Sequence, residues 1–88
     1  MTQKLYYEDS HLKEFTAQVM DCRWDEKKGC YGIVLDRTVF FPEGGGQYAD
    51  SGTIQGIFVE DAQEKANEVI HYMKKKLDVG QRIQGSID

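Results

Sequence analysis

The apolar positions near the start of the chain alternate as they do in a half-buried strand. Between residues 15 and 24 they recur at nearly every second position, and the pattern slips near Met20. A period of two puts these side chains on one face of a strand, and a slip of one residue indicates a β-bulge. The polar run of residues 25–29 then predicts a hairpin turn, which leads into a second strand over residues 31–35.

Other short runs rich in β-branched and aromatic residues predict further strands over residues 5–8, 38–41 and 52–60. The polar residues 8–11 indicate a turn, and Pro42 ends the run before it. A last strand is expected over residues 82–87, after a turn at residues 79–81. Ile83 and Ile87 then share one face of this strand, and Gly85 leaves a gap between them.

Residues 61–72 fit two interpretations. Asp61 and Glu64 are spaced as in a capping box, which favours a helix of about three turns. The run from Val69 to Met73 is β-rich, and the neighbouring elements are short strands. We therefore expect a strand, a loop and a strand.

About six short strands with turns every 8 to 12 residues predict a mainly β fold, namely a small antiparallel β-barrel. Neither a linker nor an internal repeat interrupts the pattern, so residues 1–88 are expected to form a single domain.

Composition narrows the class of protein. The chain is 40% hydrophobic and 30% charged, which is typical of a soluble globular domain, and we expect a cytoplasmic protein without a membrane span. The two cysteines, Cys22 and Cys30, are too few for a disulfide framework and are expected to be reduced. A net charge of −4 is the wrong sign for broad electrostatic binding to a nucleic acid.

The most informative segment contains three consecutive glycines, Gly44, Gly45 and Gly46, followed by Gln47. A triplet without side chains favours a loop in which backbone N–H groups can face a ligand closely. Gln47 and Thr38 add groups that both donate and accept hydrogen bonds. The set suits a small polar ligand, although a permissive solvent-facing turn would explain the same residues.

The whole run of residues 35–47 resembles the start of the editing domain of alanyl-tRNA synthetases, and the N-terminal part of the free-standing AlaX editing proteins. Four surrounding features agree with this resemblance: Leu5-Tyr6-Tyr7, Phe15-Thr16-Ala17, Asp50-Ser51-Gly52 and the closing residues 80–88. The resemblance implies a β-barrel of the translation-factor type. It also implies hydrolysis of the ester that joins serine or glycine, wrongly attached, to the 3′ end of alanine tRNA.

Site residues follow from the same resemblance. It implies that Thr38 lies near the amino-acid pocket and senses the hydroxyl of serine, that Gly44, Gly45 and Gly46 line this pocket, and that Gln47 helps to hold the substrate. Residue type alone favours a strand threonine that packs its methyl group.

The zinc ligands of the family are a His-x-x-x-His pair and a later Cys-x-x-x-His pair, and neither pair occurs in this sequence. In the family they belong to a following domain, which would begin near Ile87 and Asp88. Without such a metal the chain has no evident means of activating water, because a bound metal is what lowers the pKa of the water. We therefore expect no catalytic residue, metal ligand or cofactor in this chain, and an N-terminal half that is inactive alone.

Two other interpretations stay open. The barrel could be a non-catalytic module that docks to a protein or to RNA, or that associates with itself. It could also bind single-stranded nucleic acid through aromatic side chains, namely Tyr6, Tyr7, Trp24, Phe40 and Phe41. The acidic net charge argues against the latter. Lys74, Lys75 and Lys76 could touch a tRNA phosphate or form a solvated turn.

Overall fold

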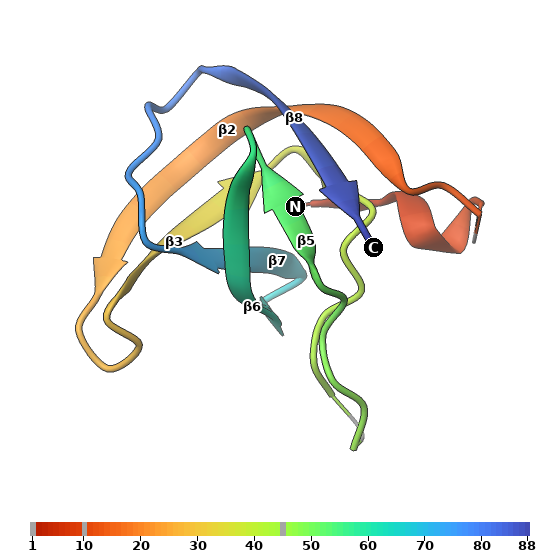
Figure 1. Cartoon of the computed structure of the whole chain (residues 1–88), viewed down its shortest axis with the longest axis horizontal. Helices are drawn as coiled ribbons and strands as arrows, with labels where there is room; N and C mark the ends of the chain where they lie inside the picture. Colours follow the sequence, from red (N-terminus) through yellow and green to blue (C-terminus); the bar gives the residue numbers. More distant parts are fainter. Residues whose placement is uncertain (1, 10, 45) are drawn as a thin grey trace.

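A computed structural model describes residues 2–9, 11–44 and 46–88 of the chain as a mainly β structure. Six antiparallel strands close into a ring in the order β2-β3-β7-β6-β5-β8 (Figure 1). The six strands are β2 (Glu14–Asp25), β3 (Cys30–Leu35), β5 (Gly52–Ile54), β6 (Ile57–Lys65), β7 (Glu68–Met73) and β8 (Arg82–Ile87). A separate parallel pair joins β1 (Gln3–Lys4) to β4 (Arg37–Thr38). The prediction of about six short antiparallel strands is confirmed.

The long strand β2 closes the ring because it pairs with two neighbours. Its first half, from Glu14 to Gln18, pairs with β8, and its second half, from Val19 to Asp25, pairs with β3. The register with β3 shifts between Val19 and Asp21, at the slip that the sequence pattern placed near Met20. A bulge bends a strand and increases its twist, so the predicted bulge is where β2 passes from one partner to the other.

The interior of the ring is filled by apolar residues, most of which alternate along the strands. The buried cluster consists of Phe15, Ala17, Val19, Ile33, Leu35, Val39, Phe40, Ile54, Val59, Ala62, Val69, Met73, Leu77 and Ile83. The gap expected at Gly85 is filled by the ring of Phe15, which a Cβ at this position would overlap. The glycine therefore allows β8 to lie close to the core.

The prediction of one strand over residues 52–60 is wrong in one respect, because this segment contains two strands, β5 and the start of β6. Gln55 and Gly56 form a two-residue turn between β5 and β6, with φ angles of 55° and 75°. Two consecutive positive φ angles are the signature of the tight turns that suit β-hairpins. The alternative of strand, loop and strand over residues 61–72 is confirmed: Ala66 and Asn67, with φ angles of 52° and 65°, make the second such turn.

The prediction of a strand over residues 5–8 is also wrong. Leu5–Tyr7 form a short 3-10 helix, η1, because the backbone N–H groups of Glu8 and Asp9 both donate to the carbonyl oxygen of Leu5, at 2.9 and 3.1 Å. This is the one helical element among the described residues, and it is far too short to cross a membrane.

The two cysteines are free and do not face one another. Cys22 lies opposite Ile33 in the β2–β3 pairing, and Cys30 lies opposite Asp25. Cys30 is buried and Cys22 packs against the core, so both serve as small apolar fillers.

Candidate functional site

The glycine segment forms the tip of a loop that leaves the ring between β4 and β5. In Figure 1 its two yellow-green arms run side by side and protrude from the ring. Phe41 and Asp50 hold the arms together: the Asp50 N–H donates to the Phe41 carbonyl at 3.0 Å, and the Phe41 N–H donates to the Asp50 carboxylate at 2.9 Å. Because the Asp50 side chain accepts the Phe41 N–H, this N–H cannot pair with a neighbouring strand. Strand β4 ends at Thr38, so the strand predicted over residues 38–41 is not formed beyond its first residue.

A tight turn closes the tip. Gly44 and Gln47 each donate their N–H to the carbonyl of the other, at 3.1 and 2.8 Å, and Gly46 has a φ angle of 82°. The turn predicted from the glycines is confirmed for Gly44 and Gly46, while Gly45 lies outside the described residues. The N–H groups of Gly44 and Gln47 are used within the turn, so these two donors do not face a ligand.

The loop borders a hollow of about 450 Å³, which we name the loop hollow and which is lined by Glu43, Gly44, Gly46, Gln47 and Tyr48. A Cβ added at Gly44 or Gly46 would meet open space, and Gln47 is exposed. The hollow therefore offers a carboxamide, a carboxylate and a phenol to a small polar ligand.

A second hollow of about 260 Å³ shares Glu43 and Tyr48 with the first and reaches to β6. Its four carboxylates are those of Glu43, Asp50, Glu60 and Asp61. Asp61 is paired with Lys28 at 2.5 Å, and Asp50 holds the loop together. This carboxylate-rich wall repels phosphate groups.

Thr38 lies in the interior, with none of its surface exposed. Its hydroxyl oxygen is 2.7 Å from Nε2 of His71 and accepts the N–H of Phe40 at 3.0 Å. His71 Nδ1 lies 3.0 Å from the carbonyl oxygen of Ile33, which can only accept, so this nitrogen carries the proton. In the neutral ring Nε2 is then an acceptor, and the Thr38 hydroxyl donates to it.

Burial lowers the pKa of His71 to about 4, and the hydrogen bond to Ile33 opposes this shift in part. The imidazole is therefore neutral at pH 7. A charged imidazolium would need a second acceptor at Nε2, where the Thr38 hydroxyl would have to reverse its hydrogen bond.

The structure brings the predicted site residues together only in part. Gly44, Gly46 and Gln47 line one hollow, whereas Thr38 lines neither of the two hollows beside the loop. Thr38 is linked to the loop along the chain, through its hydrogen bond with the N–H of Phe40.

Sequence reasoning overlooked two residues of this region, His71 and Asp50. His71 alternates with the apolar Val69 and Met73 in β7, a pattern that indicates an inward-facing histidine in need of a polar partner. Asp50 had a weaker signal, as the acidic residue that follows the glycine turn.

The described residues do not fit a zinc site. Both ring nitrogens of His71 are engaged in hydrogen bonds, and Cys30 is buried on another strand. Across residues 2–9, 11–44 and 46–88, no group of three or more His, Cys, Asp or Glu side chains is arranged to hold a metal ion.

Comparisons with known proteins match the whole chain. The family model described as tRNA synthetases class II (A) matches residues 1–88. Two relatives from Pyrococcus horikoshii are the alanyl-tRNA editing proteins AlaX-M, 42% identical over 100% of this chain and 39% of its own length, and AlaX-L, 39% identical over 100% and 23%. An alanine–tRNA ligase of Halobacterium salinarum is 38% identical over 99% of this chain and 10% of its own length. The chain thus spans well under half the length of each of these relatives.

Proposed function

Because this chain belongs to the family of class II (A) tRNA synthetases, we propose that it supplies part of an editing site, which hydrolyses the ester between a wrong amino acid and alanine tRNA. One observation carries the proposal. The residues that resemble the editing motif, Gly44, Gly46 and Gln47, line an open hollow at the tip of a protruding loop. Two of the relatives that match the chain throughout are named alanyl-tRNA editing proteins.

In this proposal the loop forms the wall that contacts the aminoacyl group. Gly44, Gly45 and Gly46 leave room for a serine or glycine residue on the tRNA 3′ end, and the Gln47 carboxamide holds it. The lack of side chains supports this role, because a Cβ added at Gly44 or Gly46 would have no neighbour within 4 Å. A side chain there would narrow the space open to the substrate.

Thr38 is proposed to sense the hydroxyl of serine. Its proton is donated to His71 and its oxygen already accepts the Phe40 N–H, so one lone pair is left to accept a hydrogen bond from the serine hydroxyl. Such a hydrogen bond contributes about 0.5–1.5 kcal/mol, which favours serine over alanine. Thr38 is fully buried, so this contact requires the interior around its hydroxyl to open.

We propose that activation of water depends on a zinc-bearing segment outside these 88 residues, in the same or another polypeptide. The described donors do not fit a metal, and His71 is committed to Thr38 and Ile33. On this proposal the 88 residues are inactive alone. The ring is of the translation-factor type and acts in the cytoplasm.

The test measures serine release from serine-charged alanine tRNA. The 88-residue chain is assayed alone and with a separately made zinc-bearing segment, in the presence and absence of a chelator. We expect release only with the segment, and abolished by the chelator. Gln47→Ala should slow it at least tenfold, whereas Gln84→Ala, which changes another exposed glutamine on β8, should not. Release by the chain alone that survives the chelator would refute the proposed inactivity.

A second function, a non-catalytic docking module, is favoured by two exposed aromatic residues. Tyr48 is 88% exposed and Phe58 is 55% exposed, and both line the carboxylate-rich hollow. Contiguous exposed apolar patches mark surfaces that a partner covers, and these two side chains border the same hollow. Oxidative footprinting of Tyr48 and Phe58 separates the two functions, because protection by the zinc-bearing segment supports the editing site.

A further inference from the structure

Lysine side chains from two distant segments gather at one end of the ring. Lys27 and Lys28 lie in the turn between β2 and β3, and Lys74, Lys75 and Lys76 follow the end of β7. The two segments meet where Lys74 Nζ donates to the carbonyl of Gly29 at 3.2 Å, across 45 residues of sequence. We name these five lysines the lysine end.

The lysine end is basic in a chain that is acidic as a whole. It holds five of the 11 lysines and arginines, although the net charge is −4. Lys28 is paired with Asp61, whereas Lys27, Lys74, Lys75 and Lys76 are exposed. Of the nearby carboxylates, that of Asp25 is turned back to the N–H of Lys28 at 3.0 Å. Two exposed carboxylates, those of Glu26 and Asp78, also lie near these lysines in the chain, so exposed lysines outnumber exposed carboxylates here by four to two.

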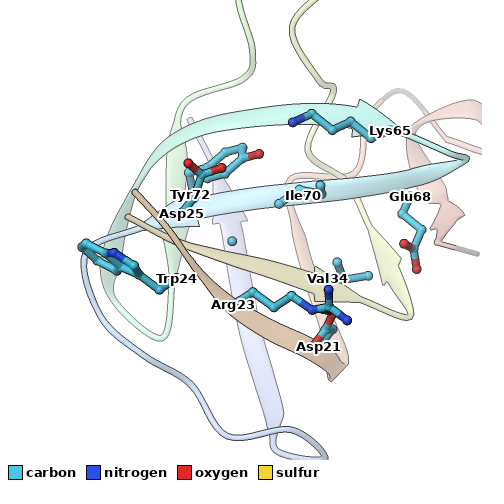
Figure 2. A pocket seen from close by; sticks show the side chains of 10 residues that line it. Asp21, Arg23, Trp24, Asp25, Val34, Lys65, Glu68, Ile70 and Tyr72 are labelled. Atoms are coloured by element: carbon cyan, nitrogen blue, oxygen red, sulfur yellow. Dashed lines mark ion pairs between the residues drawn. The ribbon is translucent and has the colours of Figure 1, made fainter. Parts of the chain in front are cut away.

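Aromatic side chains accompany these lysines. Trp24 lies at the end of β2 next to the turn, is 54% exposed and packs edge-on against Tyr31, with ring centroids 5.0 Å apart. Lys28 Nζ lies 4.9 Å from the centre of the Tyr72 ring. Trp24 and Tyr72 border a groove of about 360 Å³ on the outer face of β2, β3 and β7 (Figure 2).

The floor of this groove depends on Gly32. A Cβ at Gly32 would lie 2.9 Å from Cγ2 of Ile70, so the glycine lets Ile70 and Tyr72 lean over β3. Trp24 is exposed beside the lysines, whereas Tyr72 is only 2% exposed and the groove also carries the carboxylates of Asp21, Asp25 and Glu68. An exposed aromatic ring can stack on a base while neighbouring lysines contact the phosphates.

We propose that the lysine end binds the phosphate backbone of the tRNA, away from the glycine loop. The identity of this RNA rests on the proposed function. In Figure 1 the β2–β3 hairpin lies at the lower left and the glycine loop protrudes separately at the bottom of the view. The carboxylates of Glu43, Asp50 and Glu60 repel phosphates near the loop, Asp61 of the same hollow is paired with Lys28, and the exposed lysines of the lysine end attract phosphates. Together they orient an RNA whose 3′ end enters at the loop and whose backbone extends over the lysine end.

The experiment titrates the 88-residue chain with uncharged alanine tRNA at several salt concentrations. Emission from Trp24, the sole tryptophan, reports binding. The test variant carries Lys75→Gln and Lys76→Gln. The matched control carries Lys13→Gln and Arg82→Gln, two exposed cations that do not line the groove. Both variants remove two positive charges, and circular dichroism confirms that both fold.

We expect the test variant to bind tRNA at least about tenfold more weakly, and the control less than about twofold. The slope of log K against log salt should fall by about 1 to 2, since each lost phosphate contact contributes about 0.7–0.9. Equal weakening of both variants, or no binding by the unchanged chain, would overturn the proposal. Undiminished tRNA binding by the test variant would also overturn the proposal, and would indicate that the lysines bind an acidic protein instead.

The same titration separates this inference from the proposed function. Gln47→Ala, which is designed to impair editing, should leave the salt slope and tRNA affinity unchanged. Conversely, the lysine variant should keep its ability to support hydrolysis of a serine ester of adenosine, which has no phosphate backbone. If the complex of the unchanged chain and the zinc-bearing segment does not hydrolyse this small ester, the proposed editing function is refuted. The proposed phosphate contacts are not affected by that result.

Discussion

Thr38 and His71, which are 33 residues apart in the chain, are joined by a hydrogen bond of 2.7 Å inside the ring. His71 is in turn bound to the carbonyl of Ile33, and Thr38 to the N–H of Phe40. The four residues connect β3 and β7 to the root of the glycine loop. The polar pair at the centre of an apolar interior thus fixes where the loop begins.

Replacing Thr38 should test this connection. Thr38→Val keeps the shape of the side chain but leaves the Phe40 N–H and His71 Nε2 without partners, and we expect a loss of about 2 kcal/mol. For a domain of this size that lowers the melting temperature by roughly 10 °C. Thr38→Ser keeps the hydroxyl and should lose only about 1 kcal/mol, for the missing methyl group. Thermal unfolding in which the valine variant equals the unchanged chain would show that the hydrogen bonds contribute nothing.

Stability should depend on pH through His71. Its pKa is 6.5 when unfolded and about 4 when folded, so between these values the unfolded chain binds more protons. The stability of the neutral buried form is complete above about pH 6.5 and declines as the pH falls towards 4. The total decline is about 3 kcal/mol, at 1.36 kcal/mol per pKa unit. Urea unfolding at pH 7, 5.5 and 4.5, followed by Trp24 fluorescence, measures it.

Carboxylates also titrate at the acidic end, so variants isolate the histidine. His71→Gln should flatten the dependence between pH 6.5 and 4.5. His11→Gln, which changes an exposed turn residue, should retain it. An unchanged slope in the first variant would contradict the assignment.

The sequence predicted most strands because one face of each strand packs in the interior, which imposes a period of two. The slip at Met20 even marked the bulge that lets β2 pair with both β8 and β3. The turn at Gln55 and Gly56 was missed because it needs two positive φ angles and the sequence carries only one glycine there. Leu5–Tyr7 has the composition of a strand, yet local hydrogen bonds to Leu5 decide its form.

The candidate site was harder to predict from the sequence than the strands were. The glycine turn is local, so Gly44 and Gly46 could be assigned to a loop from composition alone. The bond from Thr38 to His71 depends on the register between β3 and β7, which places His71 opposite Ile33. Such a contact follows from three-dimensional pairing, and no local pattern encodes it.

The close packing at Gly85 makes a further prediction. Gly85→Ala should destabilise the fold by about 1–3 kcal/mol, because the new methyl group would overlap the Phe15 ring. Adding Phe15→Leu should recover part of this loss by freeing space, so the two changes together cost less than the sum of their separate effects. Chemical unfolding of the two single variants and the double variant measures the coupling. Gly44→Ala, where a Cβ meets open space, is the control. Strict additivity at Gly85 and Phe15 would argue against the overlap.

Ala66 offers a stabilising change. It has a φ angle of 52° in the two-residue turn between β6 and β7, a region that alanine adopts only at a cost. Ala66→Gly should relieve this strain and raise the free energy of unfolding by about 0.5–1 kcal/mol. Ala62→Gly, in the buried part of β6, should act in the opposite direction. A lower melting temperature for Ala66→Gly would count against the turn as described.

The central claim is that the glycine loop forms one wall of an aminoacyl pocket. The most direct measurement is a titration of the ¹⁵N-labelled chain, together with the zinc-bearing segment, with a non-hydrolysable amide analogue of serine linked to adenosine. The account predicts saturable shifts of the amide signals of Gly44, Gly46 and Gln47, with the signals of Lys74, Lys75 and Lys76 unmoved. Saturable binding that leaves the loop signals in place would contradict it.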